Sequence, residues 1–368
     1  MKELTEDQVR SMRMRAQHLA RSSRASSPEE VVRDLCGLQA QDLRASRTGV
    51  WARSSGLDDG GVERARVEDR SIVRTWAMRG TLHLLAAEDV GWIRALLAPR
   101  FIAAASPRSR QLGLDEPTYS RAMASFAPAL EGGAALTRKD LLEGLRRDGI
   151  DGSGQRTPYL IGRASMEGLI CEGPFRSGKP TYVLTSEWLG AAAGQPLKSE
   201  EEALSRLVNR FLKGYGPAAP EDLAAWSGLP VSIARRAFEN ESRSLTQVKL
   251  ADRKLSSLGE PDDAPQDTAG VMLLPAFDTY LLGYRYRDLV LDSRYLKRVN
   301  AGGGIVKPVL MVAGRVAGTW ALRRSKGAGK VEVSLFDELG QKALSGLEAR
   351  TQDLGRFLDL ELSLKLPS

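Results

Sequence analysis

The sequence predicts an α+β protein in which three tandem winged-helix units precede a C-terminal β-rich, barrel-like lobe. Helices followed by a strand pair recur along the first two thirds of the chain, and from Gly270 onward the apolar period changes to two. Segments rich in Gly, Pro and Ser separate the repeats near residues 106–118, 190–199 and 256–268. The expected domains are therefore residues 1–110, 111–192, 193–262 and 263–368.

Helix-start signals open the first unit. Thr5 precedes two acidic residues, and Ser27 precedes Pro28, which are the residue types that favour a helix N-terminus. Helices are expected near residues 5–19, 27–38, 43–53 and 87–97, and strands near 71–76 and 79–85.

The same order returns twice. In the second unit, helices are expected from Thr137 and from Arg156, then a hairpin over 169–184 with a basic tip. The third unit is expected to have helices from Ser199, Ala219 and Pro230, then a short strand at 245–248. Helix-turn-helix units commonly present a helix to DNA, and we expect at most two of the three to do so.

The last lobe reads as a small sheet or a partly closed barrel. Strands are expected at 271–274, 305–312, 315–320 and 330–335. Ala313–Gly314 is a tight hairpin signal, and Ser325–Gly329 is a second turn with basic neighbours. A helix over Glu338–Phe357 is expected to close the lobe.

Composition limits the classes of protein that fit. The chain has 368 residues, 42% of them hydrophobic and 27% charged, as in ordinary soluble globular proteins. No run approaches the roughly 18 apolar residues of a membrane helix, and the N-terminus lacks the apolar core of a signal peptide. We therefore expect a cytoplasmic protein, acting at the nucleoid, with no membrane partner.

Charge and cysteine usage narrow the choice further. A net charge of +7 and a pI of about 9.4 favour a polyanionic partner, although a merely basic surface would look the same. Two cysteines and two histidines cannot build a zinc site or a disulfide framework. Cys36 and Cys171 are expected to be buried thiols, and no metal or cofactor is expected.

The hexapeptide Gly37–Asp42 places Gln39 and Gln41 on either side of one alanine, directly after a helix. A glutamine side chain has one acceptor oxygen and two N–H donors, which can hold a water or a polar substrate edge. In a helix, residues i and i+2 point to different sides, whereas in extended chain they share one face. A cooperating pair therefore requires the chain to become extended after Leu38. Without further context, the pair would be two surface glutamines at a helix end.

Further runs accompany this motif in the same order along the chain: Trp76–Leu84, Leu273–Arg285, Gly302–Pro308 and Gly318–Trp320. With Leu38–Asp42, they make the chain resemble the AlkZ/YcaQ family of bacterial winged-helix DNA glycosylases over nearly its whole length. Gln41 favours the AlkZ branch, which has Gln-x-Gln, over the YcaQ branch, which has Gln-x-Asp. Asp42 is one residue out of register with that aspartate, so its role is not transferred.

This resemblance implies a C-shaped DNA cradle built from three winged-helix units and the β-rich lobe. It implies a monofunctional DNA glycosylase that removes alkylated bases, chiefly bulky N7-alkylguanine adducts, and for some members the unhooking of interstrand crosslinks. The implied partner is double-stranded DNA with alkylated bases. We expect a monomer with no obligate protein partner.

The chemistry fits neutral side chains. An N7-alkylguanine is already cationic and leaves readily, so a positioned water and favourable electrostatics matter more than a strong base. We predict that Gln39 and Gln41 are catalytic, with His83, Asp278 and Tyr280 as candidates for active-site support. A lone His on an apolar strand, such as His83, is more often structural, and Asp278 could equally pair with Arg285. Because crosslinked bases cannot be flipped out, we expect no deep base pocket.

Phosphate contacts are expected from basic residues beside the motif and on turns of the β-rich lobe. The candidates are Arg44, Arg47, Arg53, Arg74, Arg79, Arg298, Lys307, Arg323, Arg324, Lys326 and Lys330. A turn at Asn300–Gly304 or Ser325–Gly329 is expected to probe the minor groove, because glycine permits close backbone approach.

Two other functions account for part of this pattern. A non-enzymatic winged-helix regulator would explain the units and the charge equally well, but it would bind one sequence and release no base. A scaffold with vestigial winged folds would show no salt-dependent DNA affinity. The physiological lesion, and the choice between housekeeping repair and self-resistance to a DNA-alkylating product, stay open from the sequence.

Overall fold

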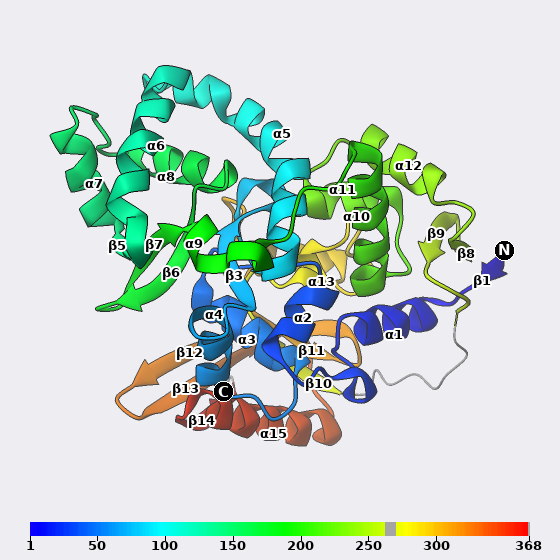
Figure 1. Cartoon of the computed structure of the whole chain (residues 1–368). Helices are drawn as coiled ribbons and strands as arrows, with labels where there is room; N and C mark the ends of the chain where they lie inside the picture. Colours follow the sequence, from blue (N-terminus) through cyan, green and yellow to red (C-terminus); the bar gives the residue numbers. More distant parts are fainter. Residues whose placement is uncertain (262–269, 367–368) are drawn as a thin grey trace. The chain divides into compact units, whose positions relative to one another are not determined.

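The computed structural model describes residues 1–261 and 270–366 and is an α+β protein (Figure 1). The chain divides into two compact units, Met1–Val62 with Ser205–Ser368 and Glu63–Leu204, which we call the terminal unit and the central unit. This division differs from the four expected domains, whose last boundary, between 262 and 263, lies outside the described residues. The four-domain division stays a prediction.

Capping sets the helix starts of the terminal unit. Its helices are α1 (Glu6–Ala16), α2 (Pro28–Asp34), α3 (Leu43–Arg53), α11 (Pro220–Ser227), α12 (Val231–Asn240), α13 (Thr279–Leu282), α14 (Leu296–Val299) and α15 (Gln341–Leu358). The Thr5 hydroxyl accepts a hydrogen bond from the Gln8 amide, and the Ser27 hydroxyl accepts one from the Glu30 amide at 3.1 Å. The helix starts predicted at Thr5 and Ser27 are therefore confirmed, as is the helix over 43–53.

A five-stranded sheet forms the C-terminal part of the terminal unit. Its strands are β10 (Val271–Leu274), β11 (Val309–Val312), β12 (Arg315–Ser325), β13 (Ala328–Leu335) and β14 (Glu361–Lys365), hydrogen-bonded in that order. Helix α15 packs against β10 and β14 and runs along this sheet in Figure 1. The predicted strands and hairpin turns are confirmed, except that the strand expected at 305–312 begins only at Val309. Strand β14, which runs parallel to β13, was not expected.

A second sheet of the terminal unit joins residues that are distant in sequence. Strands β1 (Lys2–Glu3), β8 (Thr246–Leu250) and β9 (Arg253–Ser257) are neighbours in that order, and β1 runs parallel to β8. Nearby aromatic residues are buried together: the Tyr215 ring stacks on Phe211 at 4.9 Å and lies 5.5 Å from Trp226. These contacts contribute to the core of the unit.

In the central unit, helices pack against one antiparallel sheet. Its helices are α5 (Val90–Gln111), α6 (Glu116–Leu130), α7 (Arg138–Arg147), α8 (Arg156–Met166) and α9 (Thr185–Leu189). Helices α4 (Asp59–Val67) and α10 (Glu200–Tyr215) cross the boundaries between the two units, and most of α10 belongs to the terminal unit. Strands β4 (Leu82–Ala86), β3 (Ile72–Trp76), β6 (Ile170–Arg176), β7 (Lys179–Leu184) and β5 (Leu136–Thr137) are neighbours in that order. The core lies between α6, α7, α8 and β6–β7 and includes Phe126, Leu141 and Leu160.

The segment 106–118, expected to be a linker, is mostly helical. Helix α5 continues to Gln111, and α6 begins at Glu116 with the Asp115 carboxylate as its cap. Both cysteines are buried as expected, and burial raises the pKa of the Cys171 thiol to about 12. Among the described residues, none of the helices is both long and apolar enough to cross a membrane.

Candidate active site

The end of α2 fixes the approach to the two glutamines. Cys36 and Gly37 both have positive φ values, 50° and 112°. The Gly37 amide donates to the Val32 carbonyl at 2.9 Å, and the Cys36 amide donates to the Arg33 carbonyl at 3.0 Å. This pair of bonds is the Schellman cap, which ends a helix and turns the chain away from its axis. Glycine at position 37 suits the cap because its φ is unfavourable for other residues.

The motif itself is extended. Strand β2 covers Leu38–Gln39, and exposure alternates from Gln39 onward: Gln39 is half-buried, Ala40 is fully buried and Gln41 is exposed. Gln39 and Gln41 therefore have accessible side chains, whereas Ala40 between them packs into the interior. The prediction that the chain becomes extended after Leu38 is confirmed for Leu38–Gln39, whereas the chain bends at Gln41.

Asp42 ends the motif as the N-cap of α3. Its carboxylate accepts hydrogen bonds from the Arg44 amide at 2.9 Å and the Ala45 amide at 3.2 Å. The carboxylate therefore stabilises the helix start. Arg44, in the first turn, is exposed, whereas Arg47 is half-buried and pairs with Asp59 at 3.0 Å.

Arg53, at the other end of α3, is not a DNA contact. Its side chain is fully buried, and its guanidinium forms two hydrogen bonds to Asp278, Nη1–Oδ2 at 2.8 Å and Nη2–Oδ1 at 2.7 Å. It also donates to the Gln17 side chain at 3.0 Å and to the Gly49 carbonyl at 3.1 Å. The prediction that Arg53 binds phosphate is corrected, because the side chain is fully buried and both terminal nitrogens of the guanidinium are bonded inside the protein.

Asp278 and Tyr280 also belong to the interior. Asp278 pairs with Arg53 rather than with Arg285, and its Oδ1 also accepts from the Tyr280 amide at 2.8 Å at the start of α13. Tyr280 is fully buried, its hydroxyl has no hydrogen-bond partner among the described residues, and burial raises its pKa. Neither side chain can touch DNA in this structure, so we assign both a structural role instead of active-site support.

In the central unit, His83 and Arg74 are buried and Arg79 is half-buried. His83 lies in β4, where its Nδ1 is 3.0 Å from the Thr81 carbonyl oxygen. Burial, with a smaller effect of Arg79, lowers the His83 pKa to about 3, so the ring is neutral. Arg74 hydrogen-bonds the buried Glu172 carboxylate at 2.6 Å. His83 and Arg74 are therefore structural, which corrects the suggested active-site and phosphate roles.

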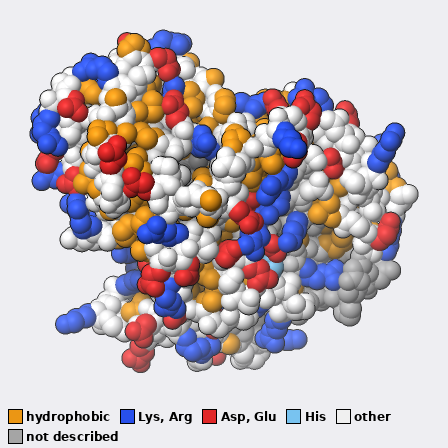
Figure 2. Space-filling model, viewed as in Figure 1, with side chains coloured by type: hydrophobic (Ala, Val, Ile, Leu, Met, Phe, Trp, Pro, Cys, Tyr) orange, Lys and Arg blue, Asp and Glu red, His pale blue; other side chains and the backbone are white. Residues whose placement is uncertain are grey.

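The candidate phosphate contacts of the C-terminal sheet lie on its surface. Exposed basic side chains there are Arg298, Lys307, Arg323, Arg324 and Lys326, the last three at the β12–β13 hairpin. Arg298 donates to the Leu335 carbonyl at 2.9 Å and lies over the Phe336 ring at 4.3 Å. Arg323 is 3.3 Å from Glu332. On the face drawn in Figure 2, basic and acidic side chains are interspersed rather than gathered in one patch.

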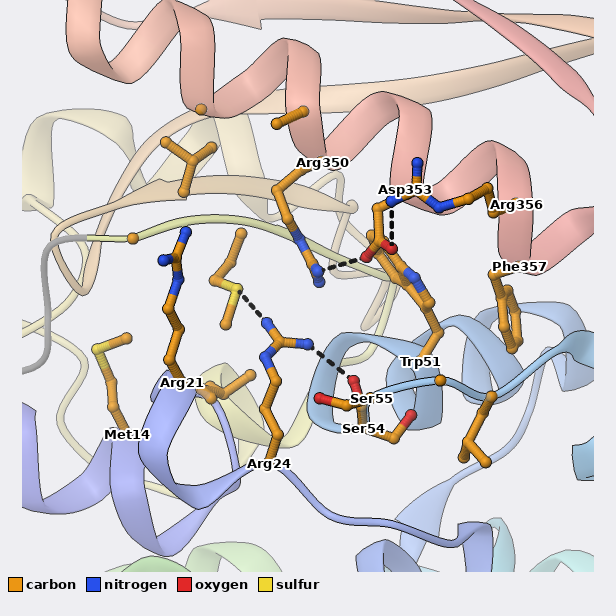
Figure 3. Close-up of a pocket in the computed structure, with 18 of the residues that line it drawn as sticks. Met14, Arg21, Arg24, Trp51, Ser54, Ser55, Arg350, Asp353, Arg356 and Phe357 are labelled. Carbon is orange, nitrogen blue, oxygen red and sulfur yellow. Dashed lines mark hydrogen bonds and ion pairs between the residues drawn. The ribbon is translucent and has the colours of Figure 1, made fainter.

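One basic cavity was not anticipated from the sequence. It has a volume of about 950 Å³ and lies in the terminal unit, where Arg21, Arg24 and Arg350 extend into the same space (Figure 3). These arginines come from two distant segments, so no local pattern could have connected them. Within 1–261 and 270–366, no group of three or more His, Cys, Asp or Glu could hold a metal ion.

Comparison with known proteins agrees with the resemblance. Residues 32–357 match the family model of the AlkZ-like DNA glycosylases. The Interstrand DNA cross-link repair glycosylase of Streptomyces sahachiroi is 32% identical over 334 residues, which cover 86% of this chain and 87% of that protein. The solved structure of Streptomyces sahachiroi DNA glycosylase AlkZ superposes with a TM-score of 0.84 at 27% identity, covering 99% of this chain and 100% of the other. The chain belongs to the AlkZ-like family of DNA glycosylases, which sets aside the non-enzymatic regulator and the scaffold.

Proposed function

We propose that Gln39 and Gln41 hold the water that hydrolyses the N-glycosidic bond of an N7-alkylated guanine. The observation that carries this proposal is the alternation of exposure at 39–41, in which two accessible amide side chains flank the fully buried Ala40. Two amides provide both acceptors and donors, so together they can fix the position and orientation of one water.

The leaving group decides whether neutral side chains suffice. Alkylation at N7 makes the base cationic, and cleavage of the glycosidic bond neutralises it without a general acid. The sugar becomes oxocarbenium-like, and a water held beneath it adds to the anomeric carbon and passes its proton to solvent. An unmodified purine lacks this positive charge, so the same site should leave it attached.

We extend the proposal to bulky adducts and interstrand crosslinks. The relative in Streptomyces sahachiroi is named for cross-link repair, and the two chains match over most of their lengths. A crosslinked base cannot be drawn into a closed pocket, and Gln41 is exposed, which suits a base attacked from outside. The helix and hairpin orders α7–α8–β6–β7 and α10–α11–α12–β8–β9 support winged-helix units as the DNA-binding frame.

Five exposed cations are proposed as phosphate contacts. Arg44 lies one turn after Gln41, and the β12–β13 hairpin carries Arg323, Arg324 and Lys326. Lys307 follows the exposed glycine turn Gly302–Gly304. Arg47, Arg298 and Arg323 already have intramolecular partners and are weaker candidates than Arg44. Arg79 of the central unit is also proposed as a phosphate contact.

The test is single-turnover release of N7-methylguanine from duplex DNA. We expect Gln39→Ala and Gln41→Ala to slow release by about 100-fold. Each variant leaves the attacking water poorly positioned, and misplacing a reacting group typically slows a reaction by about this factor. Gln341→Ala, at an exposed glutamine at the start of α15, is the matched control and should keep the wild-type rate. Wild-type rates in both motif variants would refute the water-holding role, even if the protein remains a glycosylase.

A further inference from the structure

A large cavity lies beside the C-terminal end of α3, whereas the glutamine motif precedes the N-terminal end of this helix. Its walls come from the segments around Arg21 and Ser54, from β10 and from α15. Helix α3 has 11 residues, so at about 1.5 Å per residue the cavity lies roughly 16 Å along the helix from Gln41. The cavity is therefore distinct from the proposed catalytic water site.

Positive charge dominates the wall. The lining cations are Arg21, Arg24, Lys342, Arg350 and Arg356, whereas Asp353 is the single carboxylate among the lining residues. Arg350 and Arg356 both bind this carboxylate, at 2.7 Å and 3.0 Å. One negative charge thus serves two arginines and leaves the rest of the cavity strongly positive, which favours an anionic occupant.

Arg350 is the lining arginine whose guanidinium has buried nitrogens without a hydrogen-bond acceptor among the described residues. Only Nη1 has a hydrogen-bond acceptor, while Nε and Nη2 are buried without a partner among the described residues. The guanidinium lies over the Trp51 ring at 4.1 Å, which fixes its plane. Burial, together with smaller effects of the nearby charges of Arg24 and Arg21, lowers its pKa to about 9, although the Asp353 carboxylate acts in the opposite direction. A polar group buried in this way is expected to have a counterpart.

The neighbouring arginines extend toward the same space. Arg24 is positioned by its bonds to the Ser54 carbonyl oxygen at 2.9 Å and the Met272 sulfur at 3.5 Å. Arg21 forms no ion pair with any described residue, and its side chain is exposed. Figure 3 shows these two arginines rising toward Arg350 from the opposite wall. Arginine presents several N–H donors in a plane, an arrangement that matches the oxygens of a phosphate.

The rest of the wall is apolar. Met14, Leu19, Val271 and Met272 line the cavity together with Trp51 and Phe357, whose ring centroids are 6.3 Å apart. A volume of about 950 Å³ exceeds what one phosphate ion needs and is at the upper end for a small-molecule site. The occupant should therefore combine an anionic group with an apolar or aromatic portion.

We propose that this cavity binds a phosphorylated small molecule, with its phosphate held by Arg21, Arg24 and Arg350. The remainder of the molecule lies against the apolar wall. The site is independent of the glutamine pair and would make the enzyme responsive to an organic phosphate. A DNA backbone phosphate offers the same chemistry, and the experiment separates the two sources.

Binding is measured by calorimetry on the full-length protein with adenosine 5′-monophosphate, inorganic phosphate and uncharged adenosine as probes. The monophosphate should bind and adenosine should not. Arg21→Gln and Arg350→Gln should each weaken the monophosphate at least about tenfold, as expected for loss of one charge-assisted contact. Arg243→Gln, at an exposed arginine of the same unit, should bind like wild type. Because Arg21 is exposed, its variant keeps the test valid if the Arg350 variant does not fold.

Three results would overturn the proposal. The first is that wild type binds neither phosphate, and the second is that the Arg21 variant binds the monophosphate as tightly as wild type. The third is displacement of bound monophosphate by a stoichiometric amount of undamaged duplex, which would show that the site binds a backbone phosphate of DNA. Retention of the monophosphate in the presence of duplex supports a small-molecule ligand.

Discussion

The Arg53 guanidinium and the Asp278 carboxylate form a two-bond pair, 2.7 Å and 2.8 Å long, whose side chains are 0% and 1% exposed. Asp278→Asn preserves shape but leaves a buried cation without its counter-charge. We expect a loss of about 3–5 kcal/mol in the free energy of unfolding, measured by urea denaturation. Glu143→Gln, which breaks an exposed pair with Lys139 at 3.6 Å, should change stability by less than about 1 kcal/mol. Equal effects of the two variants would contradict this account.

His18 should make the protein less stable as the pH rises through neutrality. Its Nε2 lies 3.1 Å from the Asp34 carboxylate, and its Nδ1 contacts the Ser23 carbonyl oxygen. Both partners only accept, so both ring nitrogens must carry hydrogen. Burial opposes this charge, but the bonds to Asp34 and Ser23 outweigh it and raise the His18 pKa. The stabilisation is therefore complete below the unfolded pKa of about 6.5 and is lost as the pH rises through the higher folded value.

The measurement compares the unfolding free energy of wild type and His18→Gln between about pH 5.5 and pH 9. The difference should shrink with rising pH, at no more than about 1.4 kcal/mol per pH unit for one proton. Any backbone effect of the substitution, at a residue with φ of 57°, is the same at every pH and cancels from the slope. Parallel curves would rule out the proposed charge on His18.

His83 should behave in the opposite way. Burial lowers the pKa of His83 to about 3 in the folded protein, whereas the imidazole of the unfolded chain has a pKa of about 6.5. Between these two pH values the unfolded chain therefore binds a proton that the folded protein does not bind. This group therefore destabilises the fold as the pH falls from about 6.5 toward 3. The chain has two histidines, so NMR of the imidazole carbons can follow each separately. The His83 signal should stay constant from about pH 5 to pH 8 while that of His18 shifts; a His83 titration in that range would contradict its burial.

The β12–β13 hairpin should account for part of the salt dependence of DNA binding. Each phosphate contact adds about 0.9 to the slope of log affinity against log salt, so replacing Arg323, Arg324 and Lys326 by Ala should reduce it by about 2 to 3. Fluorescence anisotropy with duplex DNA measures the slope. Arg146→Ala with Arg147→Ala, at exposed arginines of α7, serves as the control. An unchanged slope in the hairpin variant would remove these residues from the interface.

Local signals were enough to predict most elements. Thr5, Ser27 and Thr137 cap helices where the sequence places them, because each accepts a hydrogen bond from a backbone amide three residues later. Helix α6 was missed although Asp115 caps it and Pro117 follows, since the proline-containing segment also fitted a linker. The parallel pairings of β1 with β8 and β13 with β14 have no local signature at all.

The sequence was enough to predict the backbone conformation at Gln39, but not which charged side chains near the site are buried. The extended geometry at Gln39 follows from the helix end at Gly37, whereas the burial of Arg53 depends on a partner 225 residues away. Charged residues in an amphipathic helix are normally solvated, so the sequence favoured a surface role for Arg53. The same argument applies to Arg350, whose neighbours in the cavity come from the other end of the chain.

The glutamine segment is held between two helix ends, the Schellman cap at Gly37 and the Asp42 cap of α3, with Ala40 buried between them. The conformational entropy of this backbone is therefore removed when the protein folds, before any DNA is met. Encounter with a lesion needs to order two side chains and one water, not a loop. Inserting one residue between the two glutamines would place their side chains on opposite faces of the segment. Such a variant would keep both glutamines but could not hold one water between them.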